Sequence, residues 1–114
     1  MLADNEIDIV VDLKGYTYKT RINLLAERPC PLQVTFLGHP GTTGASFIDY
    51  AIADNFIINK DNESYFSEKI LKLPNCYQPT DNKRYFPHTK LSKKDLGLPE
   101  NKFIFCSFNS PYKI

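Results

Sequence analysis

The residues best suited to chemistry lie in one segment, residues 37–47, which reads LGHPGTTGASF. It contains three glycines, one proline and three small hydroxyl residues, a composition that cannot build a hydrophobic core. We therefore expect a loop whose backbone N–H groups are free to face a ligand. The segment follows the strand-like LQVTF at 32–36. Because α/β proteins form binding sites at the carboxyl ends of their strands, this loop is the first candidate site.

The same loop lacks two common nucleotide motifs. It has no lysine of the kind that a phosphate-binding P-loop carries, and its glycines do not have the G-x-G-x-x-G spacing of a dinucleotide fold. An ordinary connecting loop built from turn-forming residues is the alternative interpretation.

Four aspartates lie near the ends of expected strands: Asp8, Asp12, Asp49 and Asp54. A carboxylate pair is the machinery of glycoside hydrolysis, but sequence spacing does not fix the separation of two carboxylates in space. Asp12 and Asp49 are more simply hydrogen-bonding anchors of loops. No Asp-x-Asp motif occurs, so no metal site is predicted.

The three cysteines, Cys30, Cys76 and Cys106, are widely spaced and form no C-x-x-C pair. An odd number with this spacing favours reduced structural thiols over a disulfide framework or a metal site.

Hydrophobic patterning predicts the elements that position the loop. The β-branched run at 7–13 forms a buried strand that enters a turn at Lys14 and Gly15. Residues 75–90 are a polar connector, after which Ser92 and Asp95 have capping-box spacing and Gly97 ends a short helix. The other expected elements are a short helix at 20–27, one helical turn at 62–67, and strands at 32–37, 47–53, 70–73 and 103–108.

A series of ordered motifs connects the chain to a known family. The motifs are DLKGYT at 12–17, RPCPLQV at 28–34, LGHPGTTG at 37–44, DYAIAD at 49–54, SEKI at 67–70, LP at 73–74, FCSFN at 105–109 and YKI at 112–114. With these motifs in this order, the chain resembles the catalytic region of the O-linked N-acetylglucosaminyltransferases. That family is linked to tetratricopeptide repeats and also contains the plant SPINDLY proteins.

The resemblance implies an α/β fold made of Rossmann-like lobes, as in two-lobed glycosyltransferases of the GT-B type. Residues 1–85 would be the C-terminal part of the N-terminal catalytic lobe. Residues 86–114 would be the linker and the first strand of the C-terminal catalytic lobe. We accordingly expect a fragment of a larger enzyme that is not active alone.

The resemblance also assigns roles to residues. Lys113 would have the catalytic role of stabilising the donor diphosphate as it leaves, and Asn109 and Ser110 would bind the nucleotide. The wall between donor sugar and acceptor peptide would consist of Leu37, Gly38, His39, Pro40, Gly41 and Thr42.

Some residues depart from the family pattern. His39 stands where family members usually have tyrosine, so it is not expected to be the catalytic base, which the family places upstream. Ser110 stands in place of an amide residue that helps to hold the nucleotide. Cys30 and Phe36 replace the usual alanine and tryptophan.

The implied reaction is transfer of N-acetylglucosamine from UDP-N-acetylglucosamine to Ser or Thr hydroxyls of proteins, with no metal or other cofactor. Two alternatives stay open. One is another nucleotide-sugar-dependent transferase, such as a protein O-fucosyltransferase or an enzyme that acts on glycans. The other is a relative that binds but does not catalyse.

Composition narrows the expected partners. A net charge of +1 over 114 residues gives no electrostatic support for binding nucleic acid or a membrane surface. The apolar runs are shorter than the roughly 20 residues of a membrane span, and residues 1–6 do not form a signal peptide. We expect a cytoplasmic protein whose partners are a nucleotide-sugar, acceptor proteins, and the rest of its own chain with upstream helical repeats and a second catalytic lobe.

Overall fold

The computed structural model describes residues 2–86, 88–110 and 112. The chain divides into two units, Met1–Thr80 and Asp81–Ile114, here named the sheet unit and the C-terminal unit. The predicted boundary was at residue 85, and the assignment of the two pieces to two catalytic lobes stays a prediction.

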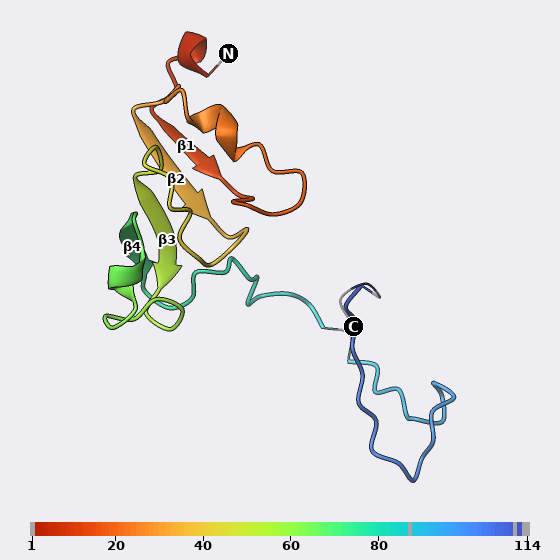
Figure 1. Cartoon of the computed structure of the whole chain (residues 1–114). Coiled ribbons are helices and arrows are strands. Elements are labelled where there is room, and N and C mark those ends of the chain that lie inside the picture. Colours follow the sequence, from red (N-terminus) through yellow and green to blue (C-terminus); the bar gives the residue numbers. More distant parts are fainter. Residues whose placement is uncertain (1, 87, 111, 113–114) are drawn as a thin grey trace. The chain divides into compact units, whose positions relative to one another are not determined.

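The sheet unit is built on four parallel strands that lie side by side in sequence order (Figure 1). They are β1 (Ile9–Asp12), β2 (Leu32–Phe36), β3 (Tyr50–Asp54) and β4 (Lys69–Leu73). Pairing aligns Ile9 with Leu32 and Asp54 with Leu73, so the carboxyl ends of all four strands meet at one edge. This sheet confirms the predicted α/β, Rossmann-like fold class.

The helices of the sheet unit are short 3-10 helices, two of which lie where helical segments were predicted. They are η1 (Ala3–Asn5), η2 (Ile22–Leu25) and η3 (Glu63–Tyr65). The helix expected at 20–27 is therefore only four residues long, and β3 starts at Tyr50 rather than at residue 47. Residues 45–48 instead contribute loop side chains to the core. Among the described residues, no helix is long and apolar enough to cross a membrane.

One cluster of the core lies where η2 and the segment before β3 pack together. Ile22, Leu25, Ala45 and Ile48 are buried there, and Val10 of β1 packs against them. The neighbours of Val10 in β1, Ile9 and Val11, point to the other face of the sheet because strand side chains alternate, and both are exposed.

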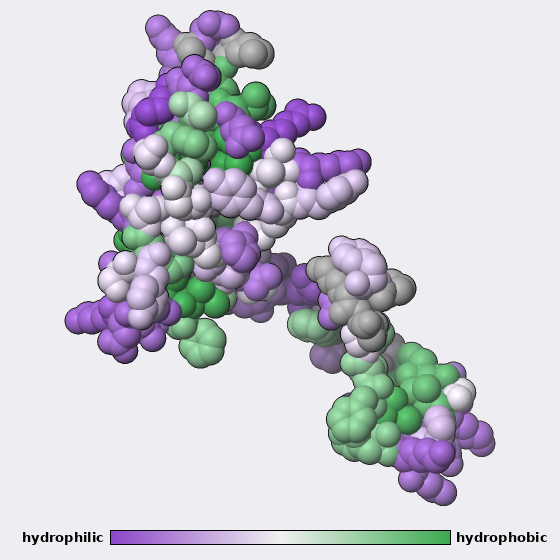
Figure 2. Space-filling view, in the orientation of Figure 1, coloured by the Kyte–Doolittle hydropathy of each residue, from purple (hydrophilic) through white to green (hydrophobic). Residues whose placement is uncertain are grey.

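The C-terminal unit contains turns but no strand among its described residues, so the strand predicted at 103–108 is wrong. An apolar run becomes a strand only when another strand pairs with its backbone, and no described segment of this unit does so. Figure 2 shows its apolar side chains at the surface, and Phe103 and Phe105 contact each other edge to face with centroids 4.9 Å apart.

The predicted capping box is present at the start of this unit's main turn. The Ser92 backbone N–H donates to the Asp95 carboxylate over 2.8 Å, and the Asp95 N–H donates to Ser92 Oγ over 3.2 Å. Gly97 follows with φ of +65°, a left-handed conformation that ends the turn. The segment remains a series of turns rather than a helix.

Candidate functional site

The loops that follow β1 and β2 are in direct contact at the carboxyl edge of the sheet. A methyl group added at Gly38 would lie 2.4 Å from the Lys14 carbonyl oxygen and 2.6 Å from the Leu13 carbonyl oxygen. Only a residue without a side chain fits there. The DLKGYT and LGHPGTTG motifs, separate in sequence, therefore form one surface.

Asp12 shapes the first of these loops. Its carboxylate accepts hydrogen bonds from the N–H groups of Lys14, over 3.2 Å, and Gly15, over 2.7 Å. Gly15 has φ of +54°, and a methyl group added to it would lie 3.6 Å from the His39 Cβ atom. The predicted role of Asp12 as a loop anchor is confirmed.

The second loop offers backbone donors. The N–H groups of His39, Gly41 and Thr42 have no hydrogen-bond partner among the residues that the structure describes. The His39 side chain is exposed and lies over Gly41, where an added methyl group would come within 2.6 Å of Nε2. The loop can therefore donate main-chain hydrogen bonds to a ligand with acceptor oxygens.

Glu68, just before β4, holds the other end of this loop. Its carboxylate accepts from the Thr42 hydroxyl and the Thr43 N–H, each over 2.7 Å, and also from the Thr43 hydroxyl. Only 5% of Glu68 is exposed. Burial raises the pKa of Glu68, but the hydrogen bonds from Thr43 and Thr42 outweigh burial and lower that pKa below its ordinary value. We call this arrangement the Glu68 latch.

The Thr42 hydroxyl is fully used within the latch. It has one proton, which goes to Glu68. Its oxygen accepts from the N–H groups of Ser67, over 3.2 Å, and Gly44, over 3.1 Å, and lies 3.0 Å from the Ser67 hydroxyl. Only the backbone and the methyl group of Thr42 are left to contact a ligand.

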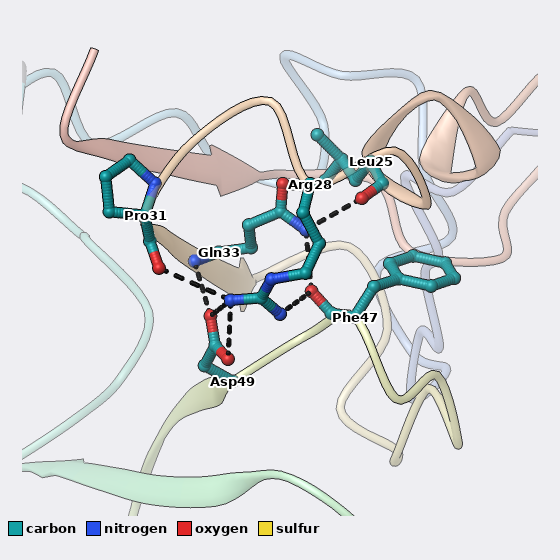
Figure 3. Close-up of polar contacts among 6 residues, drawn as sticks. All are labelled: Leu25, Arg28, Pro31, Gln33, Phe47 and Asp49. Atoms are coloured by element: carbon teal, nitrogen blue, oxygen red, sulfur yellow. Dashed lines mark hydrogen bonds and ion pairs between the residues drawn. The ribbon is translucent and has the colours of Figure 1, made fainter. Parts of the chain in front are cut away.

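A second network fixes the segment that leads into β3 (Figure 3). The Arg28 guanidinium contacts both carboxylate oxygens of Asp49 at 3.1 Å and donates to the Phe47 carbonyl oxygen. The fully buried Gln33 donates through Nε2 to the carbonyl oxygens of Leu25 and Phe47. The hydrogen bond from Arg28, with one from the Gln33 backbone, lowers the pKa of Asp49. Asp49 is thus a structural anchor, as predicted.

Asp54 performs a similar task at the end of β3. It accepts hydrogen bonds from the N–H groups of Phe56, over 2.9 Å, and Ile57, over 2.8 Å. A third bond, from Tyr77 over 2.7 Å, ties the segment after β4 to the sheet. The backbone donors of Ile57 and Tyr77 hold the pKa of Asp54 below its ordinary value.

A small pocket lies between these anchors and the loop, lined by Phe36, His39, Gly41, Ile52 and Tyr77 among others. About 10 Å³ of it is open to a water molecule, which is room for one water and not for a sugar. This pocket is therefore too small to be the cavity of a sugar site.

The predicted site residues are only partly brought together. The structure gathers Leu37, Gly38, His39, Pro40, Gly41 and Thr42 in one loop of the sheet unit. Asn109 and Ser110 belong to the C-terminal unit and are exposed, while Lys113 lies outside the described residues. Their assignments stay predictions.

Ligands for a metal do not gather in the described part of the chain. Across residues 2–86, 88–110 and 112, no three His, Cys, Asp or Glu side chains form a possible metal site. Cys30 is buried, and Cys76 and Cys106 are exposed; all three are free thiols.

Parallel strands with a ligand-accessible loop at their carboxyl edge define a Rossmann-like lobe of the kind that glycosyltransferases use. A solved structure of a mutant O-GlcNAc transferase from Thermobaculum terrenum matches this fold with a TM-score of 0.64 and 30% identity. The match covers 75% of this chain and 17% of that chain.

The family model described as glycosyl transferase family 41 matches residues 1–94, and the chain belongs to this family. It is 40% identical to a protein of Arabidopsis thaliana named probable UDP-N-acetylglucosamine–peptide N-acetylglucosaminyltransferase SEC. It is 36% identical to a SPINDLY protein of Eustoma exaltatum with the same enzyme name. Both alignments cover 100% of this chain and 12% of the relative, so the chain spans about an eighth of their length. The predicted family is confirmed.

Proposed function

We propose that the protein containing this chain transfers N-acetylglucosamine from UDP-N-acetylglucosamine to Ser or Thr hydroxyls of acceptor proteins, in the cytoplasm. The observation that carries the proposal is the similarity over the whole chain to proteins named for this activity, at 40% and 36% identity. The exposed loop, whose N–H groups at 39, 41 and 42 have no partner within the described residues, supports it, because a sugar presents hydroxyl and carbonyl oxygens as acceptors.

The chain's own residues would bind and orient the donor. The N–H groups of His39, Gly41 and Thr42 have no partners among the described residues and would donate to oxygen atoms of the sugar. Gly38, locked against Lys14, holds the loop at a fixed position relative to β1. Fixed donors of this kind stabilise a reacting group without reorganising at the moment of reaction.

Departure of the nucleotide requires positive charge near the diphosphate. Lys113 is proposed for this role, with Asn109 and Ser110 close to it in sequence as nucleotide contacts. A lysine can stabilise a leaving diphosphate without a metal ion, so transfer is proposed to be independent of divalent cations.

The test uses the complete protein that contains residues 1–114. We expect transfer of sugar to an acceptor protein from UDP-N-acetylglucosamine, in the presence of a chelator, at a rate well above that from a GDP-fucose control. No transfer from either donor would refute the proposal, and preference for GDP-fucose would replace it with protein O-fucosylation. Loss of transfer on chelation would refute the metal-independent mechanism.

A further inference from the structure

The Glu68 latch joins two segments that lie far apart in sequence. Thr42 and Thr43 belong to the loop after β2, and Glu68 precedes β4, 26 and 25 residues later. Thr42 and Thr43 together donate three hydrogen bonds to the Glu68 carboxylate, and the backbone N–H of Glu68 itself also stabilises the charge. No cation pairs with Glu68 among the described residues.

A buried carboxylate without a cationic partner contributes little to the stability of a fold, because its desolvation costs free energy. Taking an ionised group out of water is expensive, and apolar side chains of similar volume often serve a fold equally well. Here neutral donors compensate the charge, and three of them belong to Thr42 and Thr43 in the loop after β2. The carboxylate therefore acts on loop geometry more directly than on the core.

Glu68 binds the loop at one end, next to its candidate ligand-binding N–H groups. The Thr43 N–H is bound by Glu68, whereas the preceding N–H groups of Thr42, Gly41 and His39 are unpaired within the described residues. The latch therefore binds Thr43, which directly follows the N–H groups of residues 39–42 that have no partner in the described part of the chain. At the other end of the loop, Gly38 is held against Lys14.

We propose that Glu68 is a positioning residue, which fixes the conformation of residues 39–42 and thereby aims their N–H groups at the donor sugar. The role in aiming at the sugar rests on the proposed function. Glu68 itself touches no substrate; it acts through Thr42 and Thr43.

The first arm of the test uses residues 1–114 and two readouts, amide hydrogen exchange and amide chemical shifts. Replacing Glu68 by Gln introduces an NH₂ group among hydrogen-bond donors, so the Thr43 N–H should exchange about tenfold faster or more, and the His39 and Gly41 amide resonances should shift. Glu63→Gln is the matched control, since Glu63 lies on η3 and its carboxylate contacts Lys72, 2.7 Å away, and no Thr42 or Thr43 atom. That control should leave the loop amides unchanged.

The second arm uses the complete protein and measures kcat and KM for UDP-N-acetylglucosamine. Glu68→Gln and Thr42→Val should lower kcat/KM about tenfold, consistent with displaced donors. Thr42→Ser, which keeps the hydroxyl that binds Glu68, should lose clearly less than Thr42→Val. Glu63→Gln should stay within about twofold of wild type. Because Thr42→Val leaves the carboxylate in place, it serves if Glu68→Gln does not fold.

The outcomes separate the inference from the proposed function. Unchanged loop amides in Glu68→Gln, or kcat/KM within twofold of wild type in both Glu68→Gln and Thr42→Val, would overturn the positioning role. A wild-type protein that transfers no sugar would refute the proposed function, and the loop amides would still decide whether Glu68 sets the loop conformation.

Discussion

Replacing Gly38 by Ala should destabilise the sheet unit through a steric clash alone. The new methyl carbon would lie 2.4 Å from the oxygen and 2.5 Å from the carbon of the Lys14 carbonyl. Since non-bonded atoms prefer about 3.5 Å or more, the two loops would have to separate by about 1 Å. Both contacting atoms are backbone, so no side-chain rotation relieves the clash.

The expected magnitude is at the upper end of the range for overpacking, about 3 kcal/mol in the free energy of unfolding. For a domain of this size that corresponds to a fall in Tm of roughly 12–24 °C. The assay is thermal and urea unfolding of residues 1–114, followed by circular dichroism, for wild type and Gly38→Ala.

Gly44→Ala is the matched control because it combines a strained backbone conformation with open space around the added methyl group. Gly44 has φ of +63°, which disfavours alanine, but nothing lies within 4 Å of the added methyl group. Its loss should be about 1 kcal/mol, from backbone strain alone. Equal losses in the two variants, or a larger loss in Gly44→Ala, would refute the inference that the two loops are in rigid contact.

Three further predictions concern charged groups. Glu68→Gln should lower the free energy of unfolding by about 1–3 kcal/mol at neutral pH. Because the folded-state pKa of Glu68 lies below the ordinary 4.5, the difference from wild type should shrink as pH falls below that value. Urea titrations at several pH values measure this change. Asp49→Asn should lose about 1 kcal/mol or less, because its ion pair with Arg28 is partly exposed, and this difference should shrink below pH 3.8 in the same titrations. Lys113→Ala in the complete protein should slow sugar transfer about 30- to 1,000-fold, with a smaller effect on donor binding, measured as kcat and Kd; near-normal turnover would exclude the lysine from the reaction.

Local sequence signals were sufficient for the sheet. The apolar runs that became β1, β2 and β4 are bounded by turn-forming residues. Asp12 at the end of β1 and Asp49 just before β3 were correctly interpreted as anchors. The run at 103–108 is also apolar but forms no strand in the described part of the chain, because strand formation depends on a pairing partner that composition does not reveal.

The glycines and threonines of the sequence predicted the loop, but they did not predict which residues the loop contacts. The contact between Gly38 and Lys14 follows from strand register, and the bond between Thr42 and Glu68 spans 26 residues. Glu68 was quoted only as part of the SEKI motif and was not predicted to belong to the site. Its burial and its bonds to Thr42 and Thr43 appear only in the folded chain, so no sequence signal marked it.

The saturated oxygen of Thr42 has a consequence for an enzyme whose acceptors are threonine and serine hydroxyls. Under the proposed function, a threonine in the donor wall would itself be a candidate for glycosylation. Nucleophilic attack requires a lone pair, and the donors around Thr42 Oγ1 from Ser67 and Gly44 already engage its lone pairs. The hydrogen bonding that shapes the wall would thus also protect the enzyme from modifying its own Thr42.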